Sequence, residues 1–190
     1  MDIQINKQAI ILTGGPGMGK TSLIEKLGQI GYPCIQESGR HIILAELKSG
    51  GNKLPWADQQ GFAQEMFNKA VVDYKQAQTN NTRTFFDRGL PDVIGYLMLC
   101  KLPISDSLWS AAKTYRYHPQ VFIAPPWQEI YVTDNERKQS FEEAEATYEA
   151  MANVYTQLGY SLIALPKIAI DERVQFIIEK YNPKANFTLN

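Results

Sequence analysis

The segment GGPGMGKTS, at positions 14–22, contains the residues of this chain with the clearest capacity for chemistry. It matches the pattern GxxxxGK[ST] and follows the apolar run at 10–12, so a strand leads into the motif and a helix begins within it. Glycines let backbone N–H groups surround phosphate oxygens, and the helix N-terminus adds partial positive charge. We expect Lys20 to contact the outer phosphates of a nucleotide and the Thr21 hydroxyl to bind Mg²⁺. The expected nucleotide-binding residues are Gly14, Gly15, Pro16, Gly17, Met18, Gly19, Lys20, Thr21 and Ser22.

A second group of candidate residues lies in FFDRG, at positions 85–89. An acidic residue at the end of a strand beside a phosphate loop orients the metal ion, so Asp87 is the second expected Mg²⁺ residue and a candidate catalytic residue. The alternative is that Asp87 caps the helix that carries Pro91. Arg88 is expected to bind the charge of an acceptor or of a product phosphate. The alternative for Arg88 is a salt bridge to Asp87 or Asp92.

The segment QESGR, at positions 36–40, follows the second expected strand. A carboxylate there can accept a proton from a substrate hydroxyl that attacks the γ-phosphate, so Glu37 is the candidate general base. Arg40 lies one helical turn further on and is expected, with Glu37 and Arg88, to contact the acceptor. The alternatives are that Glu37 only complements a helix N-terminus and that Arg40 lies on a solvated helix face.

The residues at about 125–140 are expected to form a lid over the bound nucleotide. Arg137, a candidate catalytic residue next to Lys138, would stabilise the negative charge of the transition state, and closure would exclude water. The alternative is an exposed charged loop. Trp127 and Tyr131 suit stacking on a base, although packing a loop down is the commoner role of such residues.

Five short apolar runs alternate with helical patterns along the chain. The expected strands are 8–13, 32–36, 83–87, 120–124 and 160–165. The expected helices are 19–29, 38–50, 56–77, 91–100, one that Ser105 caps, one that follows a capping box of Ser140 and Glu143, and 171–181. This alternation predicts an α/β three-layer sandwich around a five-stranded parallel sheet of order 2-3-1-4-5. The candidate residues should then converge at the carboxyl ends of the strands, and Trp56 and Phe62 are expected in the core.

Length and composition limit the class of protein. The chain has 190 residues, which suits one domain, so we expect residues 1–190 to form a single nucleotide-binding domain. The net charge of −1 gives no reason to expect a nucleic-acid partner. The apolar runs are too short to cross a bilayer and the N-terminus lacks signal-peptide features, so a cytoplasmic protein without integral membrane contact is expected. Cys34 and Cys100 lack metal-binding spacing and are expected to be buried thiols in a reducing compartment.

The motifs that the chain lacks narrow the class of nucleotide-binding protein. It has no Asn-Lys-x-Asp base reader of a GTPase and no LSGGQ-like stretch of a transporter ATPase, and the DxxG of Asp92 and Gly95 falls inside an expected helix. The remaining layout is that of a phosphotransferase that uses Mg²⁺ and ATP, or GTP, to phosphorylate a small nucleoside-like hydroxyl acceptor. The alternative is a regulatory ATPase- or GTPase-type nucleotide-binding module without such an acceptor. A kinase needs a closed pocket of nucleoside size near Glu37, Arg40 and Arg88, which a binding module could have filled with side chains.

From about Gln8 to Tyr181 the chain also resembles a known group. The segments QESGR, FFDRGLPD, PPWQEIYVTDNERKQSFEEA and LGYSLIALP, together with the phosphate loop, are similar to the AAA-labelled P-loop predicted ATPases related to the ribosylnicotinamide kinase domain of bacterial NAD regulators. A more distant similarity is to deoxyribonucleoside kinases. That resemblance implies a P-loop NTP hydrolase or nucleoside-kinase-like fold, the base role for Glu37, the acidic-arginine pair for Asp87 and Arg88, and the lid role for Arg137. The lid departs from those kinases in having one arginine and one lysine instead of several arginines.

Overall fold

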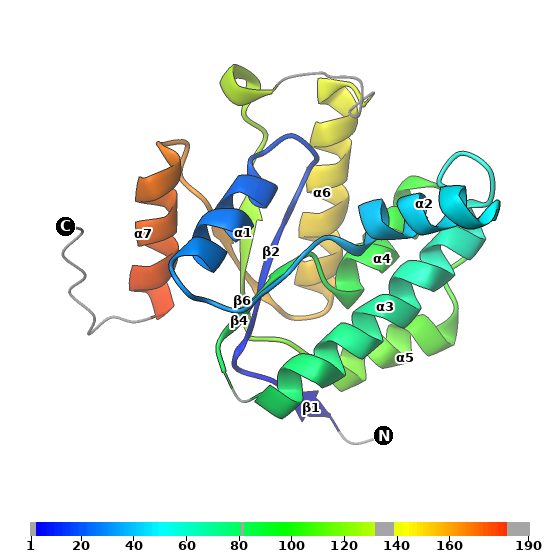
Figure 1. Cartoon of the computed structure of the whole chain (residues 1–190), viewed down its shortest axis with the longest axis horizontal. Coiled ribbons are helices and arrows are strands. Elements are labelled where there is room, and N and C mark those ends of the chain that lie inside the picture. Colours follow the sequence, from blue (N-terminus) through cyan, green and yellow to red (C-terminus); the bar gives the residue numbers. More distant parts are fainter. Residues whose placement is uncertain (1–2, 81, 132–138, 182–190) are drawn as a thin grey trace.

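The computed structural model describes residues 3–80, 82–131 and 139–181. Its strands are β1 (Gln4–Ile5), β2 (Ala9–Gly14), β3 (Cys34–Ile35), β4 (Thr84–Asp87), β5 (Tyr115–Arg116), β6 (Gln120–Ala124) and β7 (Ser161–Ala164). Its helices are α1 (Lys20–Gln29), α2 (Ser38–Ser49), α3 (Gln59–Asn80), α4 (Leu90–Leu99), α5 (Asp106–Thr114), α6 (Phe141–Gln157) and α7 (Ile170–Tyr181), with a 3₁₀ turn η1 at Gln128–Ile130. Figure 1 shows these elements along the chain.

A parallel five-stranded sheet forms the centre of the fold, in the order β3-β4-β2-β6-β7. These are the second, third, first, fourth and fifth of the expected strands, so the predicted order is confirmed. β2 lies in the middle and all of its residues are buried, because strands pair with it on both sides. In the register, Leu12 pairs with Asp87 of β4 and Gly14 pairs with Ala124 of β6. The carboxyl ends of these strands therefore meet at one edge of the sheet.

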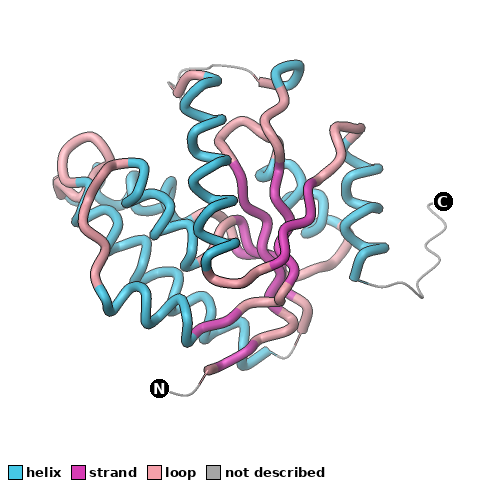
Figure 2. The backbone as a smooth tube through the Cα atoms, turned by 180° about the vertical axis from the view of Figure 1, so that it is seen from behind, coloured by secondary structure: helices cyan, strands magenta, loops and turns pink. Residues whose placement is uncertain are grey.

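Helices cover both faces of the sheet, as the three-layer prediction requires. Ile11 and Phe86 point to one face, where they pack in a core with residues of α3, α4, α5 and α6. Ile10, Leu12 and Phe85 point to the other face and pack with α1 and α7. This alternation follows from the two-residue period of a strand. Figures 1 and 2 show the strands between the two helical layers from opposite sides.

Two helix starts follow the predicted capping chemistry. The Ser140 Oγ accepts a hydrogen bond from the Glu143 N–H at 3.2 Å, and Glu143 Oε2 accepts one from the Ser140 N–H at 2.6 Å, which forms the capping box of α6. The Ser105 Oγ accepts a hydrogen bond from the Leu108 N–H at 3.3 Å at the start of α5. These side chains satisfy N–H groups that have no partner inside the helix.

The fold differs from expectation at two places. β1 and β5 pair in parallel as a separate two-stranded sheet, and the Tyr74 hydroxyl donates to the Gln4 carbonyl of β1 at 2.8 Å. Strands of two residues are too short to show a period in the sequence. The third helix begins at Gln59, so Trp56 lies before it and is 66% exposed, which makes the expectation of a core position for Trp56 wrong. Phe62 is buried in the core as expected.

Other expectations concern the thiols and the membrane. Cys34 and Cys100 are both free and half-buried, so they are less buried than the sequence suggested. Among the described helices, none combines the length and the apolar character needed to cross a membrane. The expectations of a single domain over residues 1–190 and of a lid remain predictions.

Candidate functional site

The phosphate loop connects β2 to α1 and is contacted by segments from the second half of the chain. A Cβ atom at Gly14 would lie 2.5 Å from the Ala124 carbonyl oxygen of β6, and one at Gly15 would lie 2.3 Å from the Ala144 carbonyl oxygen of α6. These are backbone atoms, so only glycine allows this closeness. The Tyr131 ring lies against Gly17, and the Arg173 guanidinium lies against Gly19.

Lys20 is the first residue of α1 and lies inside the loop. Its side chain is buried, and Nζ donates hydrogen bonds to the carbonyl oxygens of Gly15 at 2.7 Å and Gly14 at 3.2 Å. Burial, and then the positive charge of Arg88, lower the pKa of Lys20 to about 8, although Asp87 opposes this shift. The ammonium group is thus held in surroundings that favour its charge only when an anion is near.

Asp87 ends β4 and is buried beside the loop. Burial raises the pKa of Asp87 to about 6, although Lys20 opposes this. Its Oδ1 atom is buried without a hydrogen-bond partner in the described chain. A carboxylate oxygen in this condition fits a Mg²⁺ ligand, and the exposed Thr21 at the start of α1 offers a hydroxyl. Among the described residues, no group of three or more acidic, histidine or cysteine side chains is arranged to hold a metal ion.

The structure does not support the alternative in which Asp87 caps α4, the helix that carries Pro91. The N–H of Gly89 at the start of α4 donates instead to Asp92 Oδ2, at 2.8 Å. Asp92 therefore provides the acceptor at the start of this helix. The Asp87 carboxylate remains available for another role.

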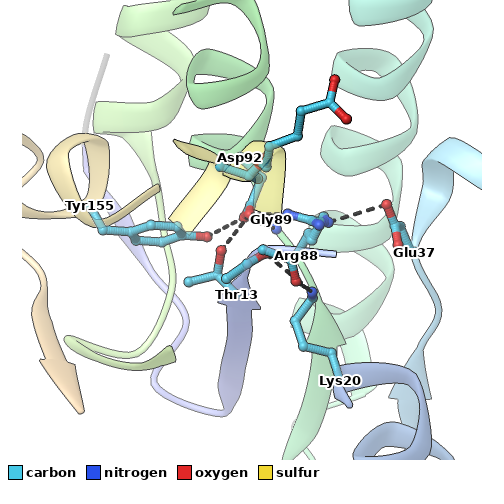
Figure 3. A network of polar contacts seen from close by, with 11 residues as sticks. Thr13, Lys20, Glu37, Arg88, Gly89, Asp92 and Tyr155 are labelled. Carbon is cyan, nitrogen blue, oxygen red and sulfur yellow. Dashed lines mark hydrogen bonds and ion pairs between the residues drawn. The ribbon is translucent and has the colours of Figure 1, made fainter. Parts of the chain in front are cut away.

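Arg88 connects the acidic residues of the site (Figure 3). Its Nε donates to Glu37 Oε1 at 3.2 Å, and its Nη1 donates to Asp92 Oδ1 at 3.3 Å. Burial disfavours the charge of Arg88, but Glu37, Asp92 and Asp87 raise its pKa above the ordinary value. Arg88 has a φ of 73°, in the left-handed region that a side chain disfavours. Strain of this kind occurs at functional sites, where the surrounding contacts hold it in place.

Glu37 follows β3 and its carboxylate is directed at Arg88. Partial burial would raise its pKa, but the charges of Arg88 and Lys20 outweigh burial and lower the pKa of Glu37 below its ordinary value. The side chain is 43% exposed, so a substrate can reach it. Glu37 is the N-cap residue of α2, so it does lie at a helix N-terminus as the alternative describes, although its side chain makes no capping hydrogen bond. Arg40 is exposed on α2, and its charge also lowers the pKa of Glu37.

The ion pair of Arg88 with Asp92 is the alternative that the sequence offered for Arg88, whereas the contacts of Asp92 with Thr13 and Tyr155 were not expected. Asp92 Oδ1 accepts a hydrogen bond from the Thr13 hydroxyl at 2.5 Å, and Oδ2 accepts one from the Tyr155 hydroxyl at 2.6 Å. Asp92 is thus the buried centre of a network that joins β2, α4 and α6 and holds one end of Arg88 (Figure 3). The available signal was an acid in the first turn of an otherwise apolar helix, but its partners are distant in the sequence.

An open cleft of about 540 Å³ lies beside Glu37. Glu37, Ser38 and His41 line one side, and Lys69 and Asp73 of α3 line another. The residues of the phosphate loop and Arg88 are not part of this lining. The cleft is larger and more open than the closed pocket that the sequence led us to expect near Arg40 and Arg88.

The expected lid is described only at its two ends. Arg137 and Lys138 lie outside the described residues. At the ends, the Tyr131 hydroxyl donates to the carbonyl oxygens of Gln139 at 2.6 Å and Ser140 at 3.0 Å. The ring centre of Trp127 lies 5.7 Å from the Arg173 guanidinium. Trp127 and Tyr131 therefore pack this part of the chain against the phosphate loop, as the structural alternative predicted.

Comparisons with known proteins concern the family and the fold of the chain. The model of a family described as AAA domain matches residues 9–173. A search of curated proteins finds no match.

Several solved structures share the fold. The NadR protein in complex with NR has a TM-score of 0.65 at 15% identity, over 96% of this chain and 52% of that chain. Thymidylate kinase from Ehrlichia chaffeensis has a TM-score of 0.58 at 15% identity, over 93% and 99% of the two chains. Shikimate kinase from Acinetobacter baumannii in complex with shikimate has a TM-score of 0.56 at 15% identity, over 94% and 95%. The chain spans about half the length of the NadR chain, and at these identities the likeness shows a P-loop kinase-like nucleotide-binding fold.

Proposed function

Since this chain belongs to the AAA domain family, we propose that it is a phosphotransferase that moves the γ-phosphate of Mg²⁺·ATP to the hydroxyl of a small nucleoside-like acceptor. The observation that carries the proposal is the position of Arg88 between Glu37 and Asp92, directly after the buried Asp87. A hydrolase needs the loop, its metal residues and a group that positions the attacking water. An accessible carboxylate held by an arginine at the same sheet edge is what an acceptor site requires.

Each residue has a role in this proposal. The amides of residues 14–22 and the Lys20 ammonium bind the phosphates, and Thr21 and Asp87 hold Mg²⁺. When bound, Mg²⁺ neutralises charge on the phosphate oxygens. Glu37, which the lowered pKa keeps ionised at neutral pH, accepts the proton of the attacking hydroxyl. Arg88 orients Glu37, and Arg40 contributes positive charge for the acceptor.

Substitution of Glu37 tests the proposal. Purified protein is incubated with Mg²⁺ and ATP or GTP and with nucleosides, riboside cofactors and sugars, and acceptor-stimulated release of the nucleoside diphosphate is measured. We expect Glu37→Gln to leave ATP affinity nearly unchanged and to lower acceptor-dependent release by about 100-fold or more. Glu149→Gln, an exposed position on α6, is the matched control and should have full activity.

The outcomes separate the candidate functions. Full transfer by Glu37→Gln would show that Glu37 is not the base. Tight nucleotide binding by the wild-type protein without stimulation by any acceptor would favour the regulatory nucleotide-binding module. Absence of Mg²⁺-dependent binding of any nucleoside triphosphate would exclude both functions.

A further inference from the structure

A buried arginine lies behind the phosphate loop. Arg173, in the first turn of α7, is 3% exposed, and its Nη1 and Nη2 atoms each lie 3.3 Å from the Met18 carbonyl oxygen. Its Nε atom has no hydrogen-bond partner in the described chain. In residues 3–80, 82–131 and 139–181, no carboxylate forms an ion pair with Arg173. A buried guanidinium is costly unless an anion compensates for it, so a negatively charged ligand beside the loop would stabilise Arg173.

The carbonyl that Arg173 holds belongs to the same peptide unit as the Gly19 N–H. The described chain has no cis peptide bond, so this carbonyl and this N–H point in opposite directions. Because the Met18 carbonyl faces Arg173, the Gly19 N–H faces away from it, toward the inside of the loop. Gly19 is the N-cap of α1, with a φ of 78° and no side chain, and N–H groups at such a position bind anions.

The surroundings of Arg173 keep water away from its charge. The Trp127 ring lies 5.7 Å from the guanidinium, and a Cβ atom at Gly19 would lie 3.0 Å from Nη1. Burial lowers the pKa of Arg173 from its ordinary value, which is the direction expected for an uncompensated cation. A charge in surroundings of low polarity acts over a longer range than the same charge in water.

We propose that Arg173 is a positioning residue of the phosphate loop. It holds the Met18–Gly19 peptide with its N–H toward the ligand, and the bound polyphosphate compensates for the charge of Arg173. The ligand class is the di- or triphosphate chain of a nucleotide, independent of the base. Arg173 touches the loop from outside and acts on phosphate through the peptide that it holds. This inference rests on nucleotide binding at residues 14–22, as proposed above.

Two substitutions of Arg173 test this role. Arg173→Met keeps an apolar stem and removes the charge, and Arg173→Lys keeps the charge without the planar pair of donors. Affinities for Mg²⁺·ATP and for Mg²⁺ with inorganic tripolyphosphate are measured by displacement of a fluorescent nucleotide, at a temperature where circular dichroism shows each variant folded. We expect Arg173→Met to weaken both ligands by about tenfold or more, and Arg173→Lys to recover part of this loss.

The control removes a different cation from the same pair of helices. Lys26 of α1 forms an exposed ion pair with Asp171 of α7 at 2.8 Å, so Lys26→Met should leave both affinities unchanged. Equal affinity of the wild-type and Arg173→Met proteins would overturn this inference alone. A loss for ATP but not for tripolyphosphate would also overturn it, because Arg173 would then act on the base. A wild-type protein that binds neither ligand would overturn the inference together with the proposed function.

Discussion

At the scale of single residues, the site holds two ionisable groups in surroundings that disfavour their charged forms. Burial lowers the pKa of Lys20 to about 8 and raises the pKa of Asp87 to about 6, so each charged form is disfavoured in the folded protein. Opposite charges within the site, including each of these groups for the other, offset burial only in part, and bound phosphate and Mg²⁺ would supply further counter-charge. The site therefore lowers the stability of the unliganded protein in return for affinity, a common arrangement at functional sites.

Lys20→Met should make the unliganded protein more stable. Because the pKa of Lys20 in the folded protein lies below its ordinary value of 10.5, the protonated side chain destabilises the fold fully at any pH below about 8. We expect the free energy of unfolding in urea at pH 7 to rise by about 1–3 kcal/mol. The affinity for Mg²⁺·ATP should fall by about 100-fold. The exposed Lys26→Met is the control, and a less stable Lys20→Met protein would contradict this account.

Nucleotide affinity should depend on pH at both ends of the neutral range. Asp87 is ionised only above a pKa of about 6, so Mg²⁺·ATP affinity should fall as the pH drops through that value. Lys20 is protonated only below a pKa of about 8, so affinity should also fall as the pH rises through it. Calorimetric titrations from pH 5 to 9 measure this profile. Asp87→Asn should abolish the part of the affinity loss at acid pH that depends on Mg²⁺. An unchanged loss in this variant would show that protonation of the nucleotide causes it.

At the scale of elements, Asp92 holds the site together. Its carboxylate accepts hydrogen bonds from Thr13 of β2 and Tyr155 of α6, and it pairs with Arg88 at the turn between β4 and α4. Asp92→Ala removes the acceptor of two hydroxyl groups and of the Gly89 N–H, and it removes one of the two carboxylates that pair with Arg88. We expect a loss of about 3–5 kcal/mol in the free energy of unfolding, measured in urea.

Two further variants calibrate that loss. Tyr155→Phe removes one donor and should cost about 1–2 kcal/mol. Asp106→Ala, exposed in the first turn of α5, should cost less than about 1 kcal/mol. An Asp92→Ala protein no less stable than Asp106→Ala would show that the network does not stabilise the fold.

The contact between the phosphate loop and α6 gives another prediction at this scale. Gly15→Ala places a methyl group against the Ala144 backbone, so α6 must shift. We expect a cost of about 1–3 kcal/mol in stability and weaker Mg²⁺·ATP binding in the same titration. Gly28→Ala, in α1, meets only the Cys34 sulfur at 3.9 Å and should be neutral or stabilising by up to about 1 kcal/mol. Equal behaviour of the two variants would contradict the close approach.

The sequence predicted elements well because their signals are local. Apolar runs marked the five strands of the main sheet, and their alternation with helices marked the sheet as parallel. The phosphate loop and Asp87 were found for the same reason, since each follows directly on a strand. The sequence did not reveal the roles of Tyr155 and Arg173 or the contacts of Asp92 with Thr13 and Tyr155, because these contacts join positions 63 to 155 residues apart and leave no local pattern. The core position predicted for Trp56 was wrong because aromatic residues are buried on average, and an average does not determine the position of one residue.

At the scale of the whole molecule, ligand binding should appear as stability. A ligand that binds only the folded state adds about 4 kcal/mol to the free energy of unfolding at a concentration 1,000 times its dissociation constant. We expect Mg²⁺·ATP to raise the urea midpoint of the wild-type protein by a corresponding amount, and at the same concentration to stabilise Lys20→Met, with its affinity weaker by about 100-fold, by only about 1.4 kcal/mol. The same experiment with GTP measures the preference between the two nucleotides. An equal rise in the variant would place the nucleotide elsewhere.

The order in which the phosphate loop acquires its contacts has a consequence for biosynthesis. The loop lies at residues 14–22, but the groups against its glycines come from Ala124, Tyr131, Ala144 and Arg173. During translation the loop leaves the ribosome early, while the last of these neighbours follows about 150 residues later, at roughly 5–20 residues per second. The nascent chain therefore carries this loop for many seconds before all of its neighbours are present, and we expect nucleotide binding only after α7 has packed against the loop.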